Sequence, residues 1–153
     1  MEELSTNSYD TTQYIVIKLG VEQYGIDIQN IDNIVRMQHI TRVPKVADYV
    51  KGVINLRGEV IPVLSLRLKM GFEEDEFTKD SRIIILKLEQ HGTLGVIVDE
   101  VKEVVTLENS AVEKFTYDSK EERNGNLIGV GKSNGQLISL LDMSIVVAEK
   151  EKE

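Results

Sequence analysis

The sequence predicts a mainly β protein: two small five-stranded SH3-like β-barrels packed side by side around a shared core, with short helical turns and a C-terminal helix. Short apolar, β-branched runs alternate with turn residues along most of the chain, which is typical of small barrels. A helical pattern of useful length occurs only near the C-terminus, whereas a doubly wound α/β fold needs helices of about 10–15 residues between its strands. The third observation is an internal repeat.

The repeat divides the chain into two related halves. Three pairs of segments recur in the same order: residues 14–19 with 83–88, 25–35 with 95–105, and 52–64 with 129–141. The last two pairs align without a gap, at numbering offsets of 95 − 25 = 70 and 129 − 52 = 77. Each half has roughly 65–75 residues, which is marginal for an independent core, so we expect the halves to pack against each other.

The hairpin at residues 53–64 is the clearest single element. Arg57, Gly58 and Glu59 form its turn, because glycine supplies the positive φ that a tight hairpin needs. Pro62 has no N–H to donate, so we expect it where that position faces away from the partner strand. Gly52, at the base of the hairpin, lets another backbone or side chain approach closely.

The remaining elements follow from local patterns. In the first half we expect strands at 13–19 and 25–28, a helical turn at 28–35 running into a strand at 34–37, an extended segment at 40–44, and single helical turns at 45–50 and 65–70. In the second half we expect strands at 81–88, 92–98 and 101–105, a turn at 107–111, a long loop at 114–126, a hairpin at 127–141, and a helix from Met143 to about Lys150 capped by Asp142. The apolar run at 81–88 is continuous, which favours burial on both faces.

These elements suggest a division into parts. We expect a disordered arm at 1–12, mainly the first barrel unit at 13–71, an acidic linker loop at 72–80, mainly the second barrel unit with the C-terminal helix at 81–147, and a frayed tail at 148–153. Exchange of strands between the two units is compatible with the same pattern.

Composition narrows the class of partner. The net charge of −8 and the pI of about 4.9 argue against nucleic acid and against an anionic membrane surface, since both require clustered Lys and Arg. No apolar run is long enough to span a bilayer, so we expect no direct membrane insertion. The chain contains no cysteine, which removes disulfides and thiolate metal sites. We expect a cytoplasmic protein.

The sequence offers no cluster of reactive groups, so we predict no catalytic residue, no metal and no cofactor. His39 and His91 lie beside turns without a second ligand at metal spacing, and a lone loop histidine is usually structural. Gly129 and Gly131 lack the third glycine of a phosphate-binding loop. An alternative function, a small-ligand or oligosaccharide-binding barrel, would need aromatic stacking residues on one face, but the chain has no Trp and few Tyr or Phe.

A groove between two barrels would suit a partner helix or strand. Ile31, Val101, Val104 and the repeated glycines are candidates to line it, although the aliphatic residues fit a plain core equally well. Arg57 at the hairpin tip is either solvated or available for partner recognition through its planar fork.

Five stretches of the sequence carry a family resemblance: 24–28, 40–44, 50–58, 95–99 and 135–142. They closely resemble the chemotaxis coupling protein family, CheW, and the likeness runs from about residue 14 to residue 147. The resemblance implies the double barrel and a non-catalytic adaptor of bacterial chemotaxis. Such an adaptor joins the cytoplasmic hairpin tips of chemoreceptors to the regulatory domain of the chemotaxis histidine kinase, and it is recruited to membrane-associated receptor arrays.

The resemblance also implies site residues. Carried over by motif position, the receptor-binding residues are Ile31, Gly52, Arg57, Gly95, Val101 and Val104. The kinase-binding residues are Ile40, Thr41 and Val43. Two positions depart from the family pattern: Asn33 stands where a glutamate often pairs with the arginine of the turn, and Ser65 replaces a frequent aspartate.

Overall fold

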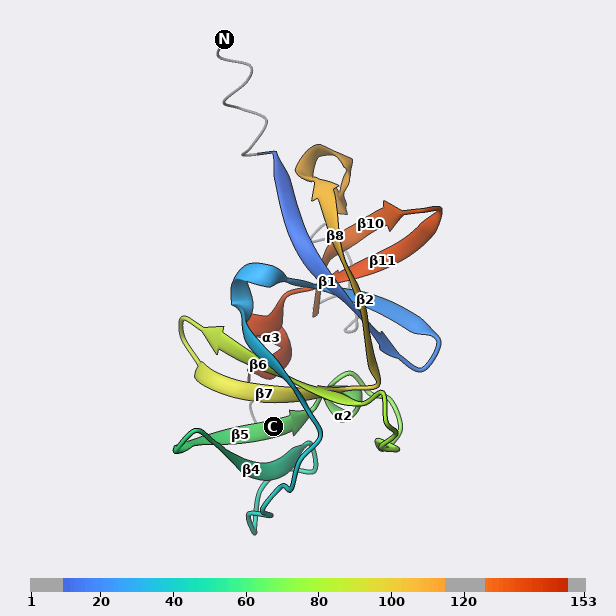
Figure 1. Cartoon of the computed structure of the whole chain (residues 1–153). Helices are drawn as coiled ribbons and strands as arrows, with labels where there is room; N and C mark the ends of the chain where they lie inside the picture. The colour runs from blue at the N-terminus through green and yellow to red at the C-terminus, as the bar shows by residue number, and fades with distance from the viewer. Residues whose placement is uncertain (1–9, 115–125, 149–153) are drawn as a thin grey trace, which may run out of the picture.

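The computed structural model describes residues 10–114 and 126–148, and within them the protein is mainly β, as predicted (Figure 1). The strands are β1 (Thr11–Leu19), β2 (Glu22–Asp27), β3 (Ile31–Arg36), β4 (Val50–Leu56), β5 (Glu59–Ser65), β6 (Arg82–Leu88), β7 (Gly92–Val98), β8 (Glu100–Glu108), β9 (Glu113–Lys114), β10 (Leu127–Ser133) and β11 (Gln136–Leu141). The helical elements are α2 (Leu66–Lys69), α3 (Met143–Val147) and the 3-10 turns η1 (Ile28–Asn30) and η2 (Asn109–Ala111).

The strands form two sheets that draw on both halves of the chain. The order in the six-stranded barrel is β8-β1-β2-β11-β10-β9, and in the five-stranded barrel it is β3-β6-β7-β5-β4. The β1–β2 hairpin therefore joins strands β8 to β11 from the second half of the chain. The β6–β7 hairpin joins strands β3 to β5 from the first half. The two barrels do not coincide with residues 13–71 and 81–147, because each half of the chain gives one hairpin to the other.

The exchange is reciprocal and follows the sequence repeat. Gly25 of β2 lies opposite Leu140 of β11, and Gly95 of β7 lies opposite Val63 of β5, both in parallel pairings. These two contacts are equivalent under the two offsets of the repeat, since 25 + 70 = 95 and 63 + 77 = 140. The two barrels are thus related by an internal pseudo-symmetry.

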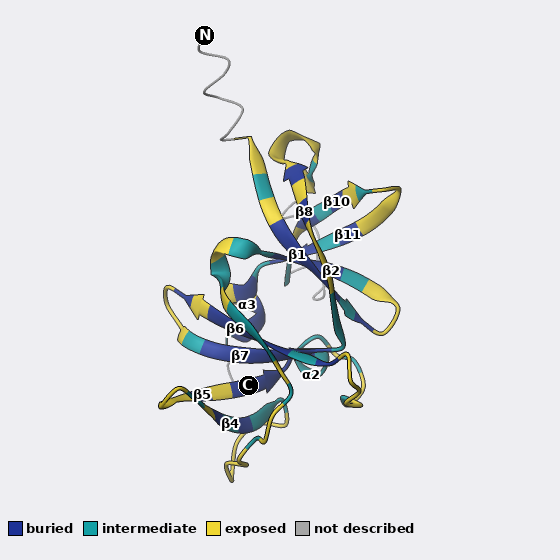
Figure 2. Ribbon diagram, in the orientation of Figure 1, coloured by how far each residue is buried: buried dark blue, intermediate teal, exposed yellow. Residues whose placement is uncertain are grey.

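The apolar core has three parts, of which the largest lies between the barrels. On β6, Ile84 and Leu86 point into this central core, whereas the alternate residues Ile83 and Ile85 fill the five-stranded barrel. The alternation explains why 81–88 is a continuous apolar run: both faces of β6 are buried, as predicted, and Figure 2 shows β6 and β7 in dark blue along much of their length.

Each barrel ends in a short helix with the same construction. The Ser65 hydroxyl accepts from the Leu68 N–H at 3.1 Å and caps α2, while the Asp142 carboxylate accepts from the Ile145 N–H and caps α3, as predicted. Because 65 + 77 = 142, the serine that departs from the family pattern occupies the position equivalent to Asp142 and keeps the capping role.

Several local predictions were wrong. The C-terminal helix ends at Val147 rather than near Lys150, because Ala148 is extended with ψ of 143°. Strand β2 begins at Glu22 rather than at residue 25. Residues 45–50 contain no helical turn, since Lys45 has φ of 62°, which a right-handed helix does not allow. Strand β3 begins at Ile31 rather than at residue 34, because only Ile28–Asn30 is helical. The predicted arm at 1–12 is too long, because β1 begins at Thr11, which pairs with Glu108 of β8. Residues 1–9 of that arm, 115–125 of the loop and 149–153 of the tail lie outside the described residues.

Candidate protein-docking surfaces

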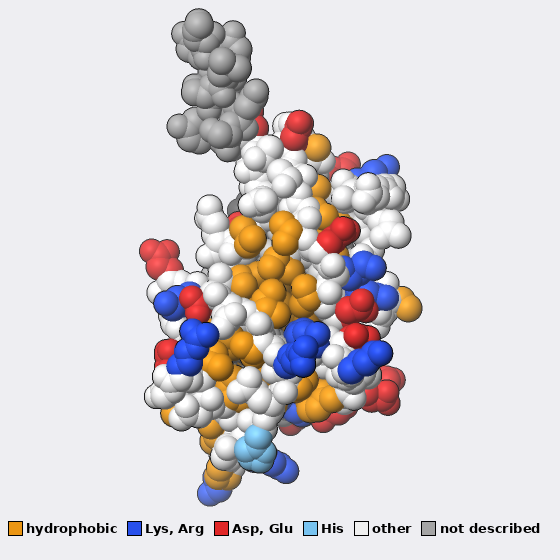
Figure 3. Space-filling view, viewed as in Figure 1, with side chains coloured by type: hydrophobic (Ala, Val, Ile, Leu, Met, Phe, Trp, Pro, Cys, Tyr) orange, Lys and Arg blue, Asp and Glu red, His pale blue; other side chains and the backbone are white. Residues whose placement is uncertain are grey.

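The first candidate surface lies at the junction of the two barrels. Ile31 on β3 and Val101 on β8 hold equivalent positions in the repeat, and both are partly buried against the central core. Val104, further along β8, is 49% exposed. Figure 3 shows hydrophobic side chains gathered at the centre of this face, in the region between the two barrels in Figure 1. We call Ile31, Val101 and Val104 the junction surface.

Each edge strand of the junction carries a β-bulge. The register of β8 against β1 shifts so that Lys102 has no partner opposite, and β3 shifts in the same way at Asp32. A bulge bends its strand and increases the local twist. The two bulges are equivalent in the repeat, since 102 − 32 = 70, and they turn β3 and β8 at the place where their aliphatic side chains reach the surface.

Gly52 and Gly95, by contrast, are buried. A Cβ at Gly52, where φ is 140°, would overlap the carbonyl of Thr41, and a Cβ at Gly95 would lie 2.8 Å from the Ile83 side chain. The absence of a side chain lets the segment before β4 cross Gly52 and form backbone hydrogen bonds between Thr41 and Val53 at 2.8 and 2.9 Å. The structure therefore gives these glycines a role in closing the five-stranded barrel and leaves them no exposed side.

Arg57 lies apart from the junction surface. Figure 1 places the turn between β4 and β5 at the outer end of the five-stranded barrel, away from β8. Arg57 is exposed with φ of 55°, and its side chain makes no hydrogen bond or ion pair with any residue that the structure describes. Asn33, at the position where relatives are expected to have glutamate, has its side-chain oxygen 2.8 Å from the Ile34 N–H and accepts from it.

The turn at Arg57 has an internal counterpart that makes its residue type unusual. Arg57 and Gly58 have φ of 55° and 84°, while the equivalent Asn134 and Gly135 have 53° and 79°. Both turns thus need a positive φ at two positions, for which Asn-Gly is the favoured pair. Arginine at the first position is held in a conformation that costs roughly 1–2 kcal/mol for an L-residue.

A second candidate surface is formed by the segment between β3 and β4. Ile40 packs against the core of the five-stranded barrel, while Thr41 and Val43 are exposed. Together with Val46 and Phe77, which are 43% and 54% exposed, Ile40 and Val43 line one shallow pocket. Sequence reasoning missed Val46 and Phe77; the signal available for Phe77 was a large aromatic residue inside an acidic loop.

The two barrels are tied together beside α2 by an ion pair. Arg67 donates from Nε and Nη2 to the two Asp99 carboxylate oxygens at 2.9 and 2.8 Å, and the Gly20 N–H donates to the same carboxylate at 2.7 Å. The hydrogen bonds from Arg67 lower the pKa of Asp99 below its ordinary value, against the opposing effect of burial. This contact links the five-stranded barrel, through α2, to the β1–β2 turn of the other barrel.

Within 10–114 and 126–148 there is no group of three His, Cys, Asp or Glu placed to hold a metal. None of the helices described for the chain has the length and apolar character to cross a membrane. Exposed apolar side chains are spread over the surface of this small β module, and two groups of them coincide with the candidate surfaces: Val104 at the junction surface, and Val43, Val46 and Phe77 beside the second pocket.

Comparison with known proteins places this module in a family. The family model described as CheW-like domain matches residues 13–151. The chain is 33% identical over 132 residues to the chemotaxis protein CheW of Helicobacter pylori, covering 86% of this chain and 79% of the relative. It is 32% identical over 139 residues to the chemotaxis protein CheW of Bacillus subtilis, covering 91% and 88%.

The crystal structure of the scaffolding protein TtCheW from Thermoanaerobacter tengcongensis superposes with a TM-score of 0.81 at 29% identity, covering 93% of this chain and 96% of that one. The chain belongs to the CheW family of chemotaxis scaffold proteins. The resemblance found in the sequence is thereby confirmed.

Proposed function

We propose that this chain is a non-catalytic adaptor that couples the cytoplasmic hairpin tips of chemoreceptors to the regulatory domain of the chemotaxis histidine kinase, in the cytoplasm at membrane-associated receptor arrays. Membership of the CheW family supports a scaffold role. An adaptor must present two surfaces to two partners at once. The observation that carries the proposal is that two of the exposed apolar sites lie on different elements of the fold: Val104 at the junction surface, and Val43, Val46 and Phe77 beside the second pocket.

The junction surface is the receptor site in this proposal. A helical hairpin presents aliphatic side chains along one face, and such a face fits a hydrophobic surface framed by two strands. Ile31 and Val101 sit above the central core, so a partner that covers them extends an existing apolar cluster and removes Val104 from water.

Arg57 makes a second, separate contact with the receptor side. The positive φ at Arg57 destabilises the folded state, because asparagine tolerates this conformation better than arginine. The Arg57 side chain has no partner among the described residues that would offset this loss of stability. A guanidinium free of internal partners can form bidentate hydrogen bonds with a carboxylate of the receptor.

The kinase site in this proposal is the pocket of Ile40 and Val43, extended by Val46 and Phe77, with Thr41 holding the segment to β4. The two sites use different elements, so one partner does not block the other.

Calorimetric titration with a purified chemoreceptor cytoplasmic fragment and, separately, with the kinase regulatory domain tests this assignment. Val101→Lys should weaken receptor binding about tenfold and leave kinase binding within about twofold, and Val43→Asp should do the reverse. Equal loss for both partners, with loss of β structure by circular dichroism, would show that Val101 is needed only for folding.

Arg57 offers a sharper variant, because the repeat supplies its replacement. Arg57→Asn copies the equivalent Asn134 and should raise the free energy of unfolding by about 0.5–1 kcal/mol, since asparagine accepts a positive φ. We expect the same variant, and Arg57→Asp, to lower receptor affinity while the melting temperature stays within a few degrees of the unmodified protein or rises. Unchanged receptor affinity in both variants would remove Arg57 from the site.

A further inference from the structure

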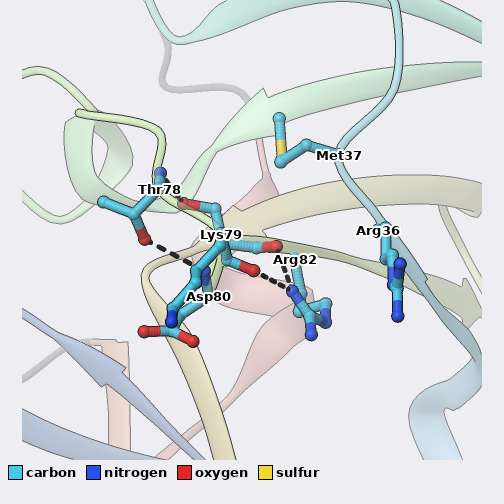
Figure 4. Close-up of a pocket in the computed structure, with 7 residues that line it drawn as sticks. Arg36, Met37, Thr78, Lys79, Asp80 and Arg82 are labelled. Atoms are coloured by element: carbon cyan, nitrogen blue, oxygen red, sulfur yellow. Dashed lines mark hydrogen bonds between the residues drawn. The ribbon is translucent and has the colours of Figure 1, made fainter.

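Two arginines face each other across the edge of the five-stranded barrel. Arg36 of β3 and Arg82 of β6 are direct partners in the antiparallel register. They line one open pocket with Met37, Lys79 and neighbouring residues, and Figure 4 shows both arginine side chains extending to the same side of the strand pair. Like charges directly opposite each other in a sheet repel, so this pair costs stability unless an anion neutralises it.

Arg82 is anchored by one nitrogen and keeps the rest of its guanidinium available. Its Nη1 donates to the backbone carbonyls of Lys79 and Ser81, both at 2.8 Å. The Nε and Nη2 edge, the fork that binds a carboxylate in a bidentate manner, has no acceptor among the described residues. The Arg36 guanidinium likewise has no hydrogen bond or ion pair within 10–114 and 126–148, and Asp80, although close in sequence, forms no ion pair there with either arginine.

The other barrel shows that the fold does not require this charge. The repeat places Thr106 and Gln13 at the positions equivalent to Arg36 and Arg82, since 106 − 36 = 70 and 82 − 13 = 69, and these two residues are also direct strand partners. They line a corresponding pocket with no basic residue, next to Asp27. The same strand pairing therefore forms with neutral side chains. The Arg36 charge and the free edge of Arg82 are not needed for it.

We propose that the pocket of Arg36 and Arg82 binds an acidic segment of a partner protein, with one carboxylate on the free edge of Arg82 and a second on Arg36. Two guanidiniums side by side match two carboxylates of one peptide better than one small ion, and Met37 offers apolar contact to the same segment. Because the chain as a whole carries a charge of −8, a local pair of unneutralised arginines can attract an acidic partner to this place. The site uses none of the residues assigned above to receptor or kinase and stands independently of that assignment.

N-acetylated hexaglutamate, titrated into the 15N-labelled full-length chain and followed by NMR at low salt, tests the proposal. The amide signals of β3 and β6 and the Nε–H signals of the two arginines should shift together. Arg36→Gln and Arg82→Gln should each weaken binding about tenfold. Lys132→Gln removes the same charge from an exposed position on β10 and should change affinity less than about twofold. Arg36→Gln removes a repulsion and no hydrogen bond, so its melting temperature should equal or exceed that of the unmodified protein.

Three results would overturn the proposal. The first is hexaglutamate binding to Arg36→Gln with unchanged affinity. The second is saturation of the same signals by inorganic phosphate at equal ionic strength with the same affinity, which would make this a small-anion site. The third is self-association in sedimentation velocity that Arg36→Gln abolishes, which would assign the pocket to the acidic loop of a second copy of this chain.

Discussion

Replacement of Asp99 by Asn should lower the free energy of unfolding at neutral pH by about 2 kcal/mol, a value between those of exposed and buried ion pairs. The side chains of Arg67 and Asp99 are 19% and 26% exposed, and their contact has two parallel hydrogen bonds. Removing one partner of a fully buried ion pair costs about 3–5 kcal/mol, whereas a solvent-exposed pair contributes about 0–1 kcal/mol. The partial burial of this pair, and the extra bond from the Gly20 N–H, place the cost between those limits.

Urea unfolding followed by circular dichroism measures this cost, and a double-mutant cycle with Arg67→Met isolates the pair. We expect a coupling of about 2 kcal/mol at low salt, within the range measured for contacting residues. Asp32→Asn is the matched control, because Asp32 and Lys87 are 3.8 Å apart and 46% and 67% exposed, so its cost should stay at about 0–1 kcal/mol. A coupling near zero, or a cost for Asp99→Asn no larger than that of the control, would refute the view that this pair joins the barrels.

The same pair has a defined pH dependence. The hydrogen bonds from Arg67 lower the pKa of Asp99 in the folded state, so folding favours the ionised carboxylate. Its contribution is therefore complete above the unfolded value of about 3.9 and is lost as the pH falls from there through the lower folded pKa. The stability difference between the unmodified protein and Asp99→Asn should be constant from about pH 5 to pH 8 and shrink below about pH 4. A difference that grows on acidification would contradict this linkage.

Two further predictions test the fold. Gly52→Ala should lower the free energy of unfolding, measured with urea, by at least about 3 kcal/mol, because φ is 140° and the new methyl group would overlap Thr41. Gly58→Ala is the control: φ there is 84° and the space is open, so the cost should be about 1–2 kcal/mol. Similar costs for the two variants would show that the segment around Thr41 moves to make room for the methyl group. Asp75→Asn should raise stability at pH 7 by about 1 kcal/mol, because burial raises the pKa of Asp75 in spite of the hydrogen bond from Ser65 and leaves Oδ1 without a partner among the described residues. Because the pKa of Asp75 is raised in the folded state, the unmodified protein gains stability as the pH falls through that pKa. The higher stability of Asp75→Asn should therefore disappear on acidification. A stability difference that persists at low pH would show that the ionised carboxylate is not its cause.

The fold class was predictable because the two halves of the sequence have equivalent residue types at the positions that each barrel needs for closure. Gly25 and Gly95 each admit a neighbouring aliphatic side chain, and residues 65 and 142 each cap a helix. The exchange of hairpins between the two halves was not predictable. The sequence repeat has the same numbering offset whether each hairpin pairs with strands of its own half or with strands of the other half. Only the register of β2 with β11 and of β7 with β5 distinguishes the two arrangements.

The candidate sites were predictable only in part, for a different reason. Val104 and Val105 are adjacent and equally apolar, yet one is 49% exposed and the other 7%, because successive residues of a strand face opposite sides. Apolar pattern alone cannot say which side faces the core when both sides are partly covered. The pairing of Arg36 with Arg82 joins two residues far apart in the sequence, so nothing short of the strand register brings them together.

The pseudo-symmetry has a consequence for where the two barrels can differ. Interior positions are alike in the two barrels, because the same glycines and caps are needed to close each one. Surface positions are free to differ between the two copies. Arg57 is equivalent in the repeat to Asn134. The strand partners Arg36 and Arg82 are equivalent to the strand partners Thr106 and Gln13. Each copy of the duplicated unit can therefore carry a different set of surface side chains on an equivalent backbone. Substitutions that make one copy resemble the other, such as Arg57→Asn, change a surface side chain at a position whose backbone the other copy shows to accept the replacement. They therefore test a proposed binding role separately from the stability of the fold.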